Sequence, residues 1–80
     1  MILSVMEFYK DNYSIILNKE NNESYEMFYQ RGKFIIHQNN PNFDELVKLS
    51  KVYVNIKFRN CIYPDKLVNK IKQMEKNILT

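Results

Sequence analysis

One stretch of the chain decides the predicted fold: Lys51-Val52-Tyr53-Val54-Asn55-Ile56-Lys57-Phe58-Arg59. Every second side chain from Val52 to Phe58 is apolar, and the alternate set of side chains, from Tyr53 to Arg59, includes Tyr53, Lys57 and Arg59. Because successive side chains of a strand point to opposite faces, this pattern predicts a strand with one buried face and one open face.

Four further strands are predicted in the first half of the chain, over residues 2–9, 13–17, 24–30 and 33–37. The polar loop Lys10-Asp11-Asn12 suits a hairpin between the first two of these strands. Gly32 is the only glycine of the chain, and it stands where a tight turn before the fourth strand would need a positive φ.

Two helices are predicted in the second half of the chain. Asn42 can cap the first, a short helix whose buried stripe is Phe43, Leu46 and Val47, and Glu45 stands three positions later, as in a capping box. The second begins at Pro64, with Asp65 near the positive end of its dipole. Its apolar side chains recur at spacings of three and four: Leu67, Val68, Ile71, Met74 and Ile78.

These elements predict one α+β domain over residues 1–80, in the order β-β-β-β-α-β-α. The strand over residues 51–59 has a single apolar face, so both helices are expected to cover the same side of the sheet. The fold class is thus a two-layer sandwich, with a mostly antiparallel sheet of about five strands and two helices on one face.

The composition excludes several classes of protein. The 80 residues are 45% hydrophobic and 26% charged, which is typical of a globular domain rather than a disordered chain. Cys61 is the only cysteine, so no disulfide scaffold is expected. No apolar run approaches the ~18 residues of a membrane span, and the first residues do not form a signal peptide. We therefore expect a cytoplasmic protein that does not enter membranes.

The inventory of reactive residues argues against catalysis. His37 and Cys61 are each the only residue of their type, and zinc sites need several such ligands. A phosphate-binding loop needs several glycines, and Gly32 is alone. We expect no catalytic residues, no metal and no cofactor.

The open face of the predicted sheet is the candidate binding surface. Its residues are Tyr53, Lys57 and Arg59, together with Tyr25 and Tyr29. Tyrosine and arginine are enriched in protein interfaces, so we expect a non-catalytic module that docks on a larger protein or nucleoprotein, with homodimerisation as a variant. Small accessory proteins of phages and mobile elements, including inhibitors of host defence such as anti-CRISPR proteins, have this size and this lack of motifs.

Nucleic-acid binding is the alternative. The first 40 residues carry four basic and five acidic side chains, whereas the last 40 carry eight basic and four acidic ones. Much of this excess lies on the polar side of the last predicted helix, at Lys66, Lys70, Lys72 and Lys76. Such a face can neutralise phosphates, although only two arginines are present in the chain.

Overall fold

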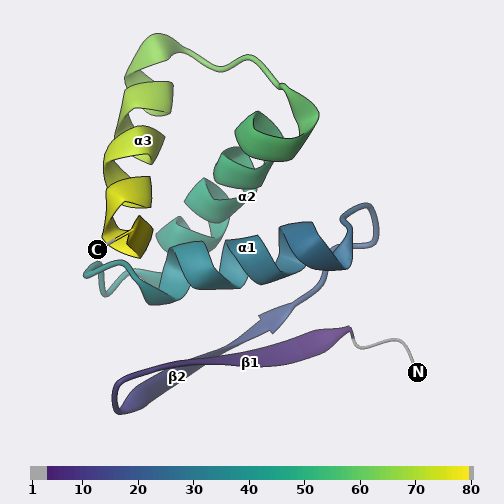
Figure 1. Cartoon of the computed structure of the whole chain (residues 1–80), viewed down its shortest axis with the longest axis vertical. Coiled ribbons are helices and arrows are strands. Elements are labelled where there is room, and N and C mark those ends of the chain that lie inside the picture. Colours follow the sequence, from purple (N-terminus) through teal and green to yellow (C-terminus); the bar gives the residue numbers. More distant parts are fainter. Residues whose placement is uncertain (1–3, 80) are drawn as a thin grey trace.

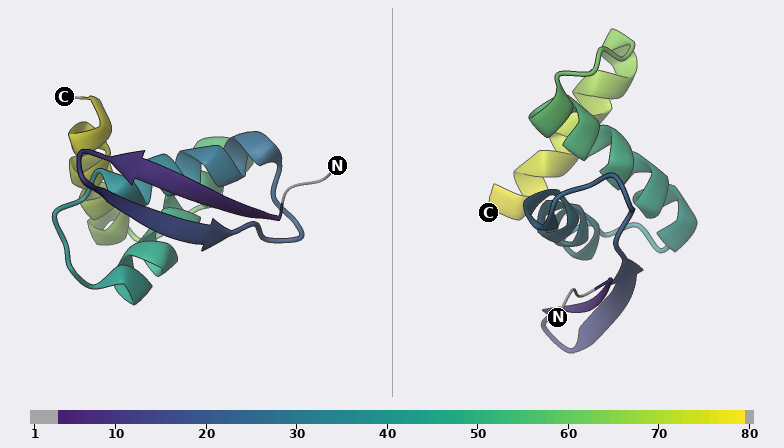
Figure 2. Two further views of the ribbon diagram at one scale, coloured as in Figure 1. Left: turned by 90° about the horizontal axis from the view of Figure 1, so that it is seen from below. Right: turned by 90° about the vertical axis from the view of Figure 1, so that its right-hand side faces the viewer.

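A computed structural model describes residues 4–79 of the chain, and it shows a β-hairpin followed by three helices (Figure 1). The elements are β1 (Val5–Lys10), β2 (Tyr13–Asn18), α1 (Tyr25–Ile36), α2 (Phe43–Arg59) and α3 (Asp65–Leu79). Helix α1 lies in the middle: the hairpin covers one side of it, and α2 and α3 lie on the other side (Figures 1 and 2). None of the helices in residues 4–79 is long and apolar enough to cross a membrane.

The hairpin forms where the sequence predicts it. β1 and β2 are antiparallel, with Lys10 opposite Tyr13, Phe8 opposite Ile15 and Met6 opposite Leu17. Asp11 in the turn has a left-handed backbone with φ of 53°, a conformation that Asp and Asn tolerate better than most residues. The predicted strand over residues 2–9 is thus confirmed in part, and its residues 2 and 3 lie outside the described residues.

The predicted five-stranded sheet is wrong, because the two strands expected over residues 24–30 and 33–37 form the single helix α1. The Ser24 side chain caps this helix by accepting a hydrogen bond from the Met27 backbone N–H at 3.1 Å. The buried side chains follow a helical spacing: Met27, Phe28, Arg31, Phe34 and Ile35. The predicted strand placed Tyr25, Met27 and Tyr29 on one face. In the structure Met27 is buried whereas Tyr25 and Tyr29 are exposed, so these three residues do not share a face.

The predicted strand over residues 51–59 is also wrong, since it is the second half of α2. Leu46, Leu49 and Tyr53 are buried at spacings of three and four, and tertiary burial along this helical face overrides the β-propensity of the valines and Ile56. The Asn42 cap is confirmed by a 3.1 Å hydrogen bond from the Glu45 backbone N–H to Asn42 Oδ1. The helix that it starts was expected to be short, but it runs for 17 residues, through the stretch predicted as a strand.

The last predicted helix is confirmed. α3 begins at Asp65, directly after Pro64, and the Pro64 carbonyl accepts the N–H groups of Leu67 and Val68 at 3.0 Å. Ile71 is its buried residue, and three further apolar side chains pack on the core: Leu67, Met74 and Ile78. Gln38 connects α3 to α1, because its Nε2 donates to the carbonyls of Phe34 and Met74 at 2.9 and 3.0 Å.

Gly32 has a role different from the predicted turn: it lets the hairpin approach α1. It lies inside the helix and has no positive φ. A Cβ placed on it would lie 2.1 Å from Cζ of Phe8, so the Phe8 ring occupies the space where a side chain would be. Phe8 is buried there and also meets Phe28 edge-on, with ring centroids 6.1 Å apart.

A buried ion pair holds the start of α1 against the hairpin. Arg31 Nε and Nη2 each donate to one carboxylate oxygen of Glu23 at 2.8 Å, and Nη2 also donates to the Asn18 carbonyl at 2.8 Å. Both side chains are almost fully buried, with 1% and 3% exposure. The pair is bidentate, which is the strongest geometry for an arginine and a carboxylate.

We predict that Gly32→Ala lowers the free energy of unfolding. Alanine is a better helix former than glycine by roughly 1 kcal/mol, but the clash with the Phe8 ring should cost about 1–3 kcal/mol of overpacking. Urea unfolding of the single and double variants measures this. In a Phe8→Ala background the clash is absent, so Gly32→Ala should become neutral or stabilising there, and equal effects in both backgrounds would contradict the contact.

We also predict that Glu23→Gln destabilises the fold by about 3–5 kcal/mol, because it leaves the buried Arg31 charge without its counter-charge. Lys51→Gln is the matched control, since it removes an exposed ion pair between Lys51 Nζ and Glu20 Oε1, at 2.5 Å. That change should cost less than about 1 kcal/mol. Thermal and urea unfolding give both values, and similar losses for the two variants would refute the assignment.

Candidate interaction surface

The open sheet face predicted around Tyr53 does not exist, because residues 51–59 are helical. Tyr53 is 3% exposed, and its ring stacks on Phe34 of α1, with centroids 4.7 Å apart and planes 22° apart. The residue is a core contact between α1 and α2.

The hydroxyl of Tyr53 connects α2 to α3. It accepts a hydrogen bond from Lys57 Nζ at 3.1 Å and donates to Glu75 Oε2 at 3.2 Å, while Lys57 and Glu75 are 3.7 Å apart. Burial raises the pKa of Tyr53, and the hydrogen bond with Tyr53 raises the pKa of Lys57. Lys57 therefore stays charged and takes part in a structural contact between two helices.

The other three residues of the predicted surface are exposed but have different surroundings. Tyr25 and Tyr29 lie one turn apart on α1, under the ammonium groups of Lys19 and Lys33, at 5.3 and 5.6 Å from the ring centroids. Arg59 is the last residue of α2. The structure thus does not bring the five residues together as the continuous strip that the sequence predicted, and their role in binding stays a prediction.

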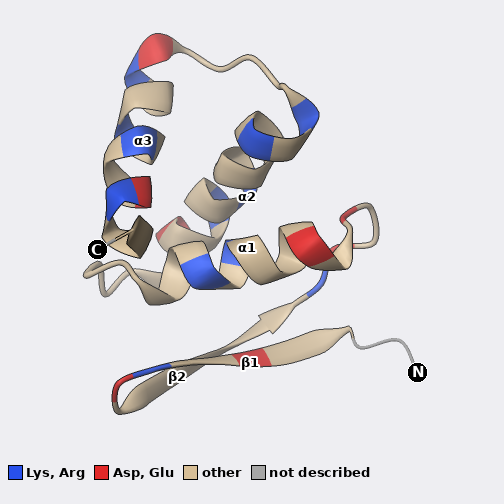
Figure 3. Cartoon of the chain, in the orientation of Figure 1, with Lys and Arg blue, Asp and Glu red and all other residues tan. Residues whose placement is uncertain are grey.

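The four lysines of the alternative reading do lie on α3 and are exposed (Figure 3). Lys70 forms an ion pair with Glu45 of α2 at 3.3 Å, and the side chains of Lys66, Lys72 and Lys76 form no ion pair with residues 4–79. Nucleic-acid binding by Lys66, Lys70, Lys72 and Lys76 stays a prediction.

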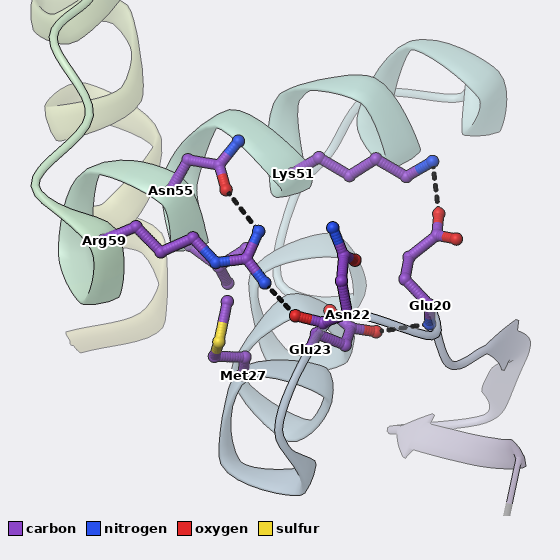
Figure 4. Close-up of a pocket in the computed structure, with 8 residues that line it drawn as sticks. Glu20, Asn22, Glu23, Met27, Lys51, Asn55 and Arg59 are labelled. Atoms are coloured by element: carbon purple, nitrogen blue, oxygen red, sulfur yellow. Dashed lines mark hydrogen bonds and ion pairs between the residues drawn. The ribbon is translucent and has the colours of Figure 1, made fainter.

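A cleft of about 270 Å³ lies between α2 and the loop before α1 (Figure 4). Its charged groups are already engaged: Lys51 pairs with Glu20, which lowers the pKa of that carboxyl. Arg59 donates to Asn55 Oδ1 at 3.2 Å and to the Asn22 carbonyl. Neither His37 nor Cys61 lines the cleft, so it contains no nucleophile with a nearby base.

The reactive residues elsewhere do not form a cluster either. Within residues 4–79 no three His, Cys, Asp or Glu side chains come together in a way that could hold a metal ion. His37 follows the last residue of α1, at the opposite end of that helix from the cleft. Burial lowers the pKa of His37, and the positive charges of Lys10 and Lys33 lower it further. Cys61 is exposed in the connection after α2.

The connection between α2 and α3 is the most unusual part of the surface. We call Cys61, Ile62 and Tyr63 the α2–α3 connection. Ile62 is 97% exposed, more than any other large apolar side chain in residues 4–79. The Ile62 side chain therefore contributes no hydrophobic stabilisation to the free protein, because almost none of its surface is removed from water.

Hydrogen bonds fix this connection at both ends. Asn60 ends α2 with a left-handed backbone, φ 54°, and the Cys61 N–H donates to the Asn55 carbonyl at 3.1 Å. Asn55 Nδ2 donates to the Tyr63 hydroxyl at 2.9 Å, and Pro64 then starts α3. Ile62 is thus presented on a short segment anchored on both sides. Sequence reasoning missed Ile62, although an apolar residue two positions before a helix-starting proline was a visible signal.

Comparison with known proteins identifies the family of the chain. Residues 16–80 match the family model of the XRN-Two Binding Domain, XTBD. No curated protein and no solved structure matches the chain. The match supports docking on a larger protein, and it gives no support to the expected phage or anti-CRISPR type of inhibitor, to a homodimer or to nucleic-acid binding. Because the match spans most of the chain, this protein belongs to the XRN-Two Binding Domain family and is a small protein-binding module.

Proposed function

We propose that this domain binds XRN2, the exonuclease for which its family is named, and that it contributes a surface rather than a reaction. The family match supports the identity of the partner. The absence of a grouped nucleophile, base or metal site in residues 4–79 favours binding over catalysis.

The observation that carries the proposal for the site is the exposure of Ile62. The whole α2–α3 connection lies inside the matched region, at the end of the molecule far from the hairpin (Figure 1), and it contains the exposed Ile62 and the half-buried Tyr63. Interface energy concentrates in a few apolar or aromatic anchors that enter pockets of the partner. A rigid segment loses little conformational entropy on docking, and the hydrogen bonds of Asn55 supply that rigidity.

We predict that Ile62→Ala and Tyr63→Ala each weaken binding to purified XRN2. Truncating a well-buried interface anchor costs roughly 1.5–3 kcal/mol, so Kd should rise about 10- to 100-fold. Isothermal titration calorimetry with the full 80-residue chain measures the change. Ile62→Ala should leave the thermal unfolding midpoint unchanged, because the side chain has almost no contacts to lose.

Tyr9→Ala is the matched control for Tyr63→Ala. Tyr9 is a tyrosine on the surface, 71% exposed, but it lies on β1, outside the matched region. Its removal should leave Kd unchanged. If the wild-type chain binds XRN2 and the Ile62 variant binds equally well, the docking site lies elsewhere on the domain; if the wild-type chain does not bind, the proposed function itself is wrong.

A further inference from the structure

The outer edge of β2 has backbone groups that no described residue pairs with. The Lys19 N–H donates to the Ser4 carbonyl at 2.8 Å, so these two residues form a hydrogen-bonded pair. Hydrogen-bonded and non-hydrogen-bonded pairs alternate along an antiparallel hairpin. The backbone N–H and C=O groups of Leu17 and Ile15 therefore point to β1. Ser14 and Ile16 therefore direct theirs away from β1. Asn18 is the next residue whose backbone groups point outward, and its carbonyl already accepts a hydrogen bond from Arg31. That carbonyl is therefore not available to another strand.

This edge also lacks the charges that usually block strand pairing. Exposed edge strands are commonly protected by charged side chains or proline. β2 reads Tyr-Ser-Ile-Ile-Leu-Asn and contains neither, whereas β1 carries Glu7 and Lys10. The edge of β2 is thus the more accessible of the two edges of the hairpin for another strand.

A groove runs beside this edge. About 580 Å³ lies between β2 and the first turns of α2, lined by Ile16, Leu17, Phe43, Val47 and Lys48 among others. A second hollow of about 230 Å³ continues it toward Tyr13 and shares Phe43. The start of α2 lies beyond the edge of β2 in both views of Figure 2. The larger volume is within the ~300–1,000 Å³ typical of binding clefts.

We propose that this groove binds an extended peptide segment, which adds to β2 as a third strand. Strand addition takes its affinity from main-chain hydrogen bonds and its specificity from pockets for alternate side chains. Here Ser14 and Ile16 supply the main-chain partners, and Phe43 and Val47 supply an apolar wall for every second residue of the peptide.

Charge defines the peptide further. Lys48 is exposed on the rim and makes no salt bridge with residues 4–79, whereas Lys51 pairs with Glu20 and Arg31 with Glu23. Asp44, also on the rim, lies in the first turn of α2, where the helix dipole offsets its charge. The bound segment therefore carries apolar residues at alternate positions and an acidic residue beside Lys48.

A second copy of this chain does not fit the same edge. Helix α1 covers one face of the hairpin, and α2 begins beyond β2 on that side (Figure 2). Pairing β2 with the β2 of a two-fold-related copy would bring the start of that copy's α2 into the space that α1 occupies. A single extended strand has no such obstacle.

The test is selection of random ten-residue peptides, displayed on phage, against the full chain. Enriched sequences should alternate apolar residues and contain Asp or Glu. With a synthetic copy of the most enriched peptide, NMR should show slower amide exchange at Ser14 and Ile16, while the amides of Glu7 and Tyr9, on the opposite edge, stay unchanged. No enrichment, or protection at Glu7 and Tyr9 instead, would overturn the proposal.

Two proline variants provide the matched comparison, because Glu7 and Ile16 face each other across the hairpin and both direct their N–H outward. Proline is tolerated at such edge positions. Ile16→Pro should weaken peptide binding about tenfold or more through loss of a main-chain hydrogen bond, and Glu7→Pro should not. Lys48→Glu should also weaken peptide binding, because it reverses the charge beside the acidic residue of the peptide. Lys48 is exposed on α2, so this change leaves the hairpin intact. Full binding by both Ile16→Pro and Lys48→Glu would refute the site.

Discussion

Helix α1 must be covered on two opposite sides, and this constraint organises the rest of the domain. On one side Phe34 stacks on Tyr53 of α2. On the other side the missing side chain of Gly32 admits the ring of Phe8 from the hairpin. Three helices alone would leave the second side in water, and a hairpin alone is rarely stable. Each layer is therefore stabilised by burying a different face of the same helix.

Polar contacts then fix the layers relative to one another. Arg31 joins the loop before α1, through Glu23, to the end of β2, through the Asn18 carbonyl. Gln38 joins α1 to α3, and Tyr53, Lys57 and Glu75 join α2 to α3. Lys57, one of the charged residues that the sequence offers for recognition, is engaged in these contacts. The two surfaces that we propose for binding are an apolar connection and a strand edge.

The parts of the fold that depend on local signals could be predicted from the sequence. Asn42 and Pro64 mark helix starts, and Lys10 to Tyr13 mark a turn, because capping and turn formation involve neighbouring residues only. The stretch from Lys51 to Arg59 could not be assigned in this way. Its alternation fits a strand, but Leu46, Leu49 and Tyr53 place one helical face against α1, and that contact is visible only in three dimensions.

The same distinction applies to the binding surface. Tyr53 has the chemistry of an interface residue, yet its neighbours in space bury it, while Ile62 has the chemistry of a core residue and is exposed. Residue type therefore indicated a protein-binding module correctly, but it predicted one continuous strip of five residues that the structure does not bring together. For Arg31, whose ion pair is central to the core, no pattern in the sequence distinguished it from a surface arginine.

The family match begins at Ile16, in the middle of β2, and it therefore leaves out β1, the strand with which β2 pairs. A truncated chain that started at that residue would keep half of β2 and lose its partner strand. Phe28 and the bare backbone of Gly32 would then face solvent. The folded unit of this protein is consequently longer than the segment that matches the family, and the additional strand covers apolar surface of α1 that would otherwise meet water.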